Sequence, residues 1–168
     1  GPVACQNNNG QFTNNEGRII AGGVDLDHPP RTVIYLSTPM TNLVIGGWTT
    51  ILFDAIESDS DSQADIPNNR IIIKYTGTYI VIASCRWSGG INPAASRMSA
   101  QILRNGATID VDDSHASLNT YLRNPNHRIK NLTAGDLITA QARPFTAGNT
   151  ADIQAGQNVT NLQVHRLS

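Results

Sequence analysis

From residue 31 onward, the chain alternates between short β-prone runs and clusters of turn-forming residues. The runs are rich in Val, Ile, Thr and aromatic residues, as in "TVIYLS" (32–37), "RIIIKY" (70–75) and "DLITAQARPF" (136–145). Gly, Pro, Asn and Asp gather between them, and Asn105-Gly106 is the strongest short hairpin signal. This spacing predicts an antiparallel β-sandwich of about eight to ten short strands.

Residues 92–104 leave a helical alternative open. Asn92 suits an N-cap, and Pro93 suits the first position of a helix. The same run leads directly into Asn105-Gly106, however, so we interpret it as the first strand of a hairpin.

The first 30 residues differ in composition from the rest of the chain. Asn, Gly and Gln dominate as far as Gly17, and Pro29 and Pro30 mark a boundary because proline does not enter central strands. Residues 1–2, Gly-Pro, are typical of the scar that a protease leaves after removing a tag. We therefore predict an N-terminal arm over residues 1–30 and a head domain over residues 31–168.

The arm is too polar to form a core of its own. Its apolar cluster consists of Ile19, Ile20, Val24 and Leu26. Such a pattern is typical of a segment that orders when it docks on a partner, or that adds a strand to an exposed sheet edge. We predict that these residues anchor the chain to another protein, with a disordered linker as the alternative.

The stretch from residue 77 to residue 87 is apolar on both faces. Strand side chains alternate, so one face carries Tyr79, Val81, Ala83, Cys85 and Trp87, and the other carries Ile80 and Ile82. An antiparallel strand usually turns one face to water. The second apolar face therefore predicts a cover, either a neighbouring subunit or a loop or arm of the same chain.

The low charge of the chain excludes two classes of partner. Charged residues make up 15% of the 168 residues and the net charge is −1, so no basic field attracts nucleic acid or anionic lipid. No apolar run reaches the roughly 18–20 residues that a membrane span needs. The 17 Asn residues indicate a surface of amides, which is common on extracellular and virion proteins.

The two cysteines do not form a recognisable disulfide framework. Cys5 lies in the polar arm and Cys85 in an apolar strand. We favour two free thiols over a disulfide between them.

The acidic segment at residues 59–65 is a candidate calcium site. Its carboxylates are the hard oxygen donors that calcium prefers. An EF-hand is excluded, because Ala64 stands where the loop needs Gly and Arg70 where it needs Glu. We keep Asp59, Asp61 and Asp65 as candidate ligands of a looser site, with a solvated loop as the alternative, and predict no other cofactor.

No pattern in the sequence predicts catalysis. Asp113, Ser114 and His115 are adjacent, but neighbours on a strand point to opposite faces and a catalytic triad needs converging side chains. The chain has no G-x-S-x-G, HxH or HExxH motif. We therefore predict a protein that is not an enzyme.

Five short motifs of the head domain resemble those of a known family. They are "GTYIV" (77–81), "NLTAGDLITAQA" (131–142), "GWTTILFD" (47–54), "ILRNGATI" (102–109) and "TNLQVHRL" (160–167). In the second motif, Leu132, Gly135, Asp136 and Leu137 match a Leu-x-x-Gly-Asp-hydrophobic signature. Together they resemble the globular head of complement component one q, which shares its jelly roll with tumour necrosis factor, over residues 31–168.

This resemblance implies an antiparallel jelly-roll β-sandwich of about ten strands that forms a homotrimer around a threefold axis. In this family, one sheet packs inward on the core and outward on neighbouring subunits, which would cover the second apolar face of residues 77–87. The interface residues that follow are Tyr79, Ile80, Ile82, Val164 and His165.

The chain departs from the animal members in two respects: it has no Gly-X-Y repeats, and its strands contain few aromatic residues. Both favour a microbial or bacteriophage branch. We predict a structural or adhesive module of a bacteriophage virion, such as a tail-fibre tip, head fibre or decoration protein. The arm would bind another virion protein, and the head a host receptor or glycan. A bacterial surface or spore-coat adhesin, or a secreted ligand with a complement-type head, is the alternative.

Overall fold

The computed structural model describes residues 30–88, 97–115, 123–145 and 151–167, and the backbone of four short strands nearer the N-terminus. Almost all regular structure in these ranges is β-strand, and the exception is the 3₁₀ turn η1 (Ile66–Asn68). Within the same ranges, no helix is long and apolar enough to cross a membrane. The all-β prediction is therefore confirmed.

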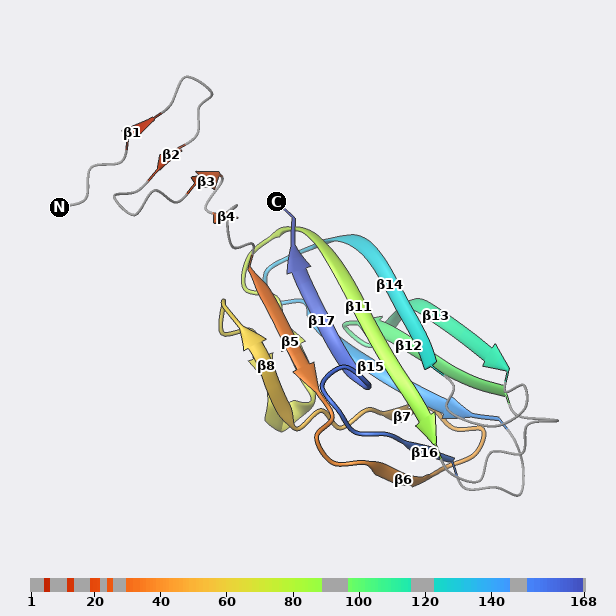
Figure 1. Cartoon of the computed structure of the whole chain (residues 1–168). Helices are drawn as coiled ribbons and strands as arrows, with labels where there is room; N and C mark the ends of the chain where they lie inside the picture. The colour runs from red at the N-terminus through yellow and green to blue at the C-terminus, as the bar shows by residue number, and fades with distance from the viewer. Residues whose placement is uncertain are drawn as a thin grey trace.

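Two antiparallel sheets form the head (Figure 1). The first sheet runs in the order β6 (Met40–Leu43), β16 (Ala151–Ile153), β11 (Gly77–Ser88), β17 (Asn161–Arg166), β5 (Arg31–Tyr35) and β8 (Ala55–Asp59), and β14 (Arg123–Leu132) also pairs with β11. The second runs β13 (Ala107–His115), β12 (Arg97–Arg104), β15 (Leu137–Pro144), β10 (Arg70–Ile72) and β9 (Ala64–Asp65), with β7 (Thr49–Thr50) paired to β15. The arrangement is an antiparallel jelly-roll sandwich, as predicted.

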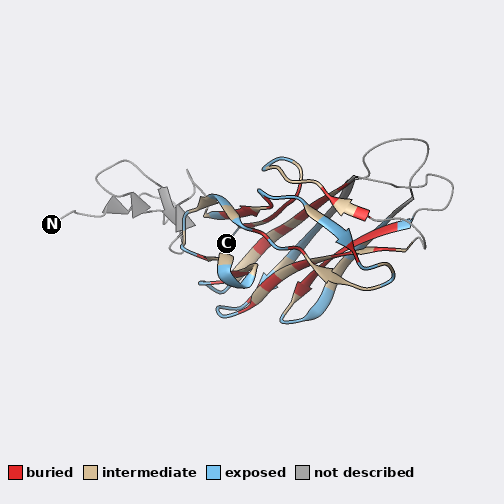
Figure 2. Ribbon diagram, turned by 90° about the horizontal axis from the view of Figure 1, so that it is seen from below, coloured by how far each residue is buried: buried red, intermediate tan, exposed pale blue. Residues whose placement is uncertain are grey.

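The core lies between the two sheets, where alternating apolar side chains of both meet. Figure 2 marks the buried residues of the strands in red. Its largest fully buried side chains include Trp87, Tyr79 and Phe53. Cys85 is a buried free thiol in this core, and burial raises its pKa, so it behaves as a small apolar side chain. This confirms a free thiol at Cys85, while the side chain of Cys5 lies outside the described residues.

The predicted hairpin forms between β12 and β13. Arg104 pairs with Ala107, and the two residues between them have positive φ angles, 51° at Asn105 and 81° at Gly106. Positive φ at both positions is what a two-residue hairpin turn requires. The helical alternative is wrong for residues 97–104, which form β12, and residues 92–96 lie outside the described residues.

A second turn, just before β15, fastens this hairpin to the rest of the sheet. Gly135 has a φ of 93°, which only glycine adopts without strain. The Asp136 carboxylate accepts hydrogen bonds from the Thr133 N–H (2.7 Å) and Asn105 Nδ2 (2.7 Å), and Arg104 lies 2.8 Å away. In the Gly-Asp pair of the sequence motif, Gly135 thus allows the turn to form and Asp136 bonds that turn to the hairpin.

Some segments differ from the prediction. The acidic segment at residues 59–65, for which a solvated loop was the alternative, begins with the last residue of β8 and ends with β9. The backbone of β8 pairs with β5 in the register Thr32 with Asp59 and Ile34 with Ile56. In the motif at residues 47–54, ladder pairing is confined to Thr49–Thr50. Strand β16 was not predicted, and Pro125 lies within β14, where an edge position tolerates proline.

The arm contributes four strands of two or three residues, β1 (Cys5–Gln6), β2 (Phe12–Thr13), β3 (Ile19–Ala21) and β4 (Val24–Asp25). In the described backbone they pair with one another and not with the head. The side chains of Ile19, Ile20 and Val24, and all of Leu26, lie outside the described residues, so the anchoring role stays a prediction.

Candidate subunit interface

The second apolar face of β11 belongs to a surface that spans three strands. Ile80 pairs with His165 on β17 and with Ile129 on β14, and Ile82 pairs with Gln163 and His127 on the same two strands. Directly paired residues of an antiparallel sheet point to the same side. We call the side formed by Ile80, Ile82, His127, Ile129, Gln163 and His165 the outer face.

The outer face is incompletely covered within the protomer. Ile80 and Ile82 are half-buried, and Ile129 is 65% exposed. Among the described residues, no strand or loop of the second sheet packs on this side, because the core lies on the other. The three isoleucines therefore form an apolar stripe across β11 and β14.

Two of the predicted interface residues are wrong. Tyr79 and Val164 are both 0% exposed, because their side chains point between the sheets. Val164 pairs with Val81, a core residue, and strand alternation places it on the core side with Tyr79. Neither has surface to offer a partner, whereas Ile80, Ile82 and His165 remain candidates.

Polar side chains continue the outer face along β17. Asn161 Nδ2 donates to the Gln157 carbonyl (2.7 Å), Gln163 Nε2 donates to Asn161 Oδ1 (3.0 Å), and His165 Nε2 lies 3.0 Å from Gln163 Oε1. Because an amide oxygen only accepts, His165 Nε2 is the donor in the last bond. These hydrogen bonds fix the orientations of the Asn161, Gln163 and His165 side chains within the single protomer.

The electrostatic environment keeps His165 neutral at neutral pH. Burial lowers its pKa, the positive charge of Arg31 lowers it further, and Glu57 opposes these effects. Arg31 is the direct pair of His165 across β5, and its guanidinium lies 3.4 Å from Glu57. A neutral imidazole is compatible with a dry contact, whereas an imidazolium would have to be desolvated.

The three candidate calcium ligands do not converge. Asp59 accepts hydrogen bonds from the Gln63 N–H (2.7 Å), the Ala64 N–H (3.1 Å) and the Thr32 hydroxyl (2.9 Å). The carboxylates are therefore used within the fold, since Asp59 closes the turn between β8 and β9.

The other two carboxylates have different surroundings. Asp65 accepts from Asn68 and Arg70 at the start of η1. Burial raises the pKa of Asp61, which the charge of Arg166 lowers in part. Across the described ranges, no group of three or more His, Cys, Asp or Glu side chains is placed to hold a metal.

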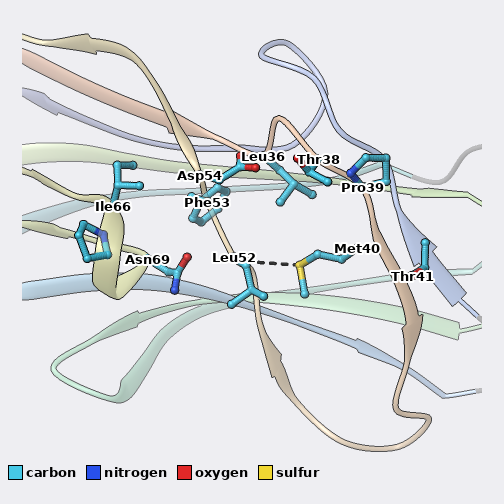
Figure 3. A pocket seen from close by; sticks show the side chains of 11 residues that line it. Leu36, Thr38, Pro39, Met40, Thr41, Leu52, Phe53, Asp54, Ile66 and Asn69 are labelled. Carbon is cyan, nitrogen blue, oxygen red and sulfur yellow. Dashed lines mark hydrogen bonds between the residues drawn. The ribbon is translucent and has the colours of Figure 1, made fainter.

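A pocket of about 490 Å³ opens beside the end of β5, with walls from residues 38–41, residues 52–54 and η1 (Figure 3). Its floor includes Leu36 and Phe53, and its acidic group is Asp54. The Asp54 carboxylate accepts from both the N–H (2.5 Å) and the hydroxyl (2.9 Å) of Ser37. Burial alone would raise the pKa of Asp54, but the bonds from Ser37 outweigh it, so this carboxylate is a poor general base.

Of the residues considered for a triad, Asp113 is the one whose side chain the structure describes. Asp113 pairs with Arg97 and the Ser99 hydroxyl on the neighbouring strand. The side chains of Ser114 and His115 lie outside the described residues.

The sequence did not reveal Gln163, His127 or Ile129 as members of the outer face. Pro125 interrupts the run at residues 123–132, and the alternation of His127, Ile129 and Asn131 around it was not recognised as a strand. The pairing register of β14 and β17 against β11 would have placed these residues on the outer face, but a strand's own sequence does not give its register.

Several solved structures match the chain, although no family model and no curated protein does. It is similar to murine APRIL at pH 8.0, with a TM-score of 0.64 and 13% identity over 83% of this chain and 100% of that one. It is similar to the Eiger TNF of S. frugiperda (TM-score 0.59, 13% identity, 84% and 94% covered) and to the globular domain of zebrafish complement 1qA (0.57, 12%, 83% and 98%). At these identities the likeness shows the fold, and the head of this chain is a jelly roll of the kind found in TNF and complement 1q proteins.

Proposed function

We propose that the head domain forms a homotrimer through the outer face and serves as a non-enzymatic structural or adhesive module. The observation that carries this proposal is the apolar stripe of Ile80, Ile82 and Ile129, next to a hydrogen-bonded polar row on β17. An exposed apolar stripe framed by ordered polar groups is typical of protein contact surfaces. Each isoleucine that becomes fully buried contributes about 1.5–3 kcal/mol at most.

We further propose that this module belongs to a bacteriophage virion. The amide-rich, weakly charged surface supports this placement. In the described backbone, the arm strands pair among themselves and leave the head complete. The arm would therefore join the head to another virion protein, and the head would present its loops and outer sheet to a host receptor or glycan.

Two matched substitutions test the assembly. Ile129→Asp puts a charge on the outer face at a position that is 65% exposed in the protomer, so it should not prevent folding. Val111→Asp makes the same change on β13 of the other sheet, at a position that is 51% exposed. Light scattering should report three chains of 18.1 kDa for the wild type and Val111→Asp. It should report single chains for Ile129→Asp, because burying an unpaired carboxylate is costly.

A monomeric wild type at micromolar concentration would refute the trimer. The same conclusion would follow if Ile129→Asp assembled as well as Val111→Asp.

The virion placement has a separate test. Antibodies raised against the head should label purified particles of the source phage by electron microscopy. Labelling of secreted material or cell surfaces, with bare particles, would contradict the placement and favour the adhesin or secreted-ligand alternatives.

A further inference from the structure

The outward side of the second sheet carries a row of charged and aromatic side chains. Ser99 pairs with Arg143 on β15 and with Asp113 on β13. The neighbours of Arg143 on its strand, Ala142 and Pro144, are buried, so alternation turns Arg143 outward. Ala142 pairs with Thr49 on β7, so Arg143, which follows Ala142, lies near Trp48, which precedes Thr49.

In this row, guanidinium groups and aromatic rings alternate. The Cζ atom of Arg143 lies 4.0 Å from the ring centre of Phe145 and 4.3 Å from that of Trp48. Arg97 lies over the Phe145 ring as well, at 4.7 Å. Both rings attract the cation, and stacking on a planar guanidinium fixes its orientation. We call Trp48, Arg143 and Phe145 the aromatic clamp.

The two arginines of this row differ in their charge balance. Arg97 forms an ion pair with Asp113, which also accepts a hydrogen bond from the Ser99 hydroxyl. The Ser99 bond and the Arg97 contact hold the pKa of Asp113 below its ordinary value, so this partner stays ionised.

Arg143, in contrast, has no carboxylate within ion-pair distance in the described part of the chain. Its Nε is buried and has no hydrogen-bond partner. Among the described residues, the two rings are the groups in contact with the guanidinium, and the carboxylate of Asp113 acts on it only through its charge. A cation that is partly desolvated and unpaired is costly unless an anion completes the site.

Beside the clamp lies a row of amide and hydroxyl groups. Gln101 Nε2 donates to Gln141 Oε1 at 2.7 Å, and the Thr108 hydroxyl donates to Gln101 Oε1 at 2.9 Å. Gln141 is two residues from Arg143 on β15 and so faces the same side. Thr50, at 3.5 Å from Gln141 Nε2, extends the row toward Trp48. Gln101 is buried, whereas Gln141 and Thr50 are partly exposed and can exchange hydrogen bonds with sugar hydroxyls.

We propose that the aromatic clamp binds an acidic saccharide, with the sugar carboxylate on the outer N–H groups of Arg143 and the hydroxyls toward Gln141 and Thr50. The planar fork of arginine matches a carboxylate with two parallel hydrogen bonds. One unpaired cation fits a single negative charge, whereas nucleic acids and highly sulfated chains need many. The proposal deepens the adhesive part of the proposed function and rests on it, but its site lies within one protomer.

The first test changes only the ligand. Isothermal titration of the full chain uses 3′-sialyllactose and trigalacturonic acid as carboxylated probes, and lactose and the methyl esters of both probes as neutral ones. At least one carboxylated probe should bind, and its methyl ester should bind about tenfold more weakly or worse, since a charge-assisted bond is lost. Absence of binding by both acids, or equal binding of acid and ester, would overturn the proposal.

The second test changes the clamp. Arg143→Gln should weaken binding of the acid about tenfold or more, and Arg143→Lys should weaken it as well, since the charge remains but the planar fork is lost. Arg128→Gln is the control, because Arg128 is ion-paired to Asp110 and stacks on no ring in the described residues. If Arg143→Gln fails to fold, the lysine variant decides.

Wild-type affinity in the lysine variant would refute the site. Light scattering on the same samples separates this proposal from the assembly. A trimer that ignores both acids refutes the saccharide site alone, and a monomer that binds them refutes the trimer alone.

Discussion

His165 and Gln163, two residues apart on β17, face the same side of the sheet with His165 Nε2 3.0 Å from Gln163 Oε1. This bond requires a hydrogen on Nε2 but not a charge on the ring, and burial together with Arg31 lowers the pKa of His165. In unfolded chains the histidine pKa is near 6.5. Between that value and the lower folded value, the unfolded state binds more protons, so stability falls as pH falls.

We therefore predict that the melting temperature decreases as the pH is lowered below about 6.5. His165→Gln should flatten this part of the profile, because the substituted side chain does not titrate. The carboxylates with lowered pKa, Asp54, Asp65, Asp113 and Asp136, lose their contribution only below about pH 4 and so fall outside this window. Scanning calorimetry from pH 5 to 8 measures the melting temperature of the wild type and of His165→Gln. Identical pH profiles of the two melting temperatures would contradict the prediction.

The Gly106→Ala substitution tests the hairpin. Gly106 has a φ of 81°, and an added Cβ would meet no atom within 4 Å, so the cost is backbone strain alone. We expect a loss of about 1–2 kcal/mol in the free energy of unfolding. Gly47→Ala is the control, since Gly47 has no positive φ and its Cβ would make an ordinary contact with Val44. Urea titration measures both, and equal effects would argue against strain at the turn.

Asp136→Asn tests the turn before β15. The carboxylate accepts from the Thr133 N–H and from Asn105, and it pairs with Arg104 while almost fully buried. Burial would raise the pKa of Asp136, but these partners outweigh it and lower it. Because hydrogen bonds to a charged group are worth about 1.5–3 kcal/mol each, we expect a loss of about 2–3 kcal/mol at pH 7.

Glu57→Gln is the matched control for that experiment. Its pair with Arg31 is longer, at 3.4 Å, and more exposed, so the expected loss is below about 1 kcal/mol. The difference between the two variants should shrink as pH falls below the folded pKa of Asp136, where the carboxylate is protonated. If Glu57→Gln lowers the free energy of unfolding as much as Asp136→Asn does, Asp136 does not stabilise the turn in the way described.

Deletion of residues 1–30 tests the division into arm and head. The arm strands pair with one another and with no strand of the head in the described backbone. We expect the truncated chain to keep its melting temperature within a few degrees and to remain a trimer, but to lose attachment to particles that lack the protein. Pull-down against such particles is the measurement, and full attachment of the truncated head would disprove the anchoring role.

Local signals were enough to predict much of the fold. Asn105-Gly106 located the hairpin because only a few residue types adopt positive φ. The alternation along β11 correctly separated Trp87 from Ile80 and Ile82. These features depend on neighbours within a few residues.

The features that the sequence did not reveal depend on partners far along the chain. Strand β8 carries two acidic residues and leads into an acidic segment, and it becomes a strand by pairing with β5, as in Thr32 with Asp59. Val164 was assigned to the wrong side because the register of β17 against Val81 cannot be read from β17 alone. The clamp around Arg143 likewise joins Trp48 and Phe145, which are nearly 100 positions apart.

Strand β17 fills the gap between β5 and β11, two strands that are nearly 50 residues apart in sequence and are both synthesised long before it (Figure 1). Until β17 has docked during folding, neither the polar row of Gln163 and His165 nor a continuous outer face exists. The edges of β5 and β11 stay open to mispairing for that time, because an unpaired strand edge is a template for another strand. The outer face is therefore completed by contacts between distant parts of one chain, and any association through it must wait for that long-range pairing.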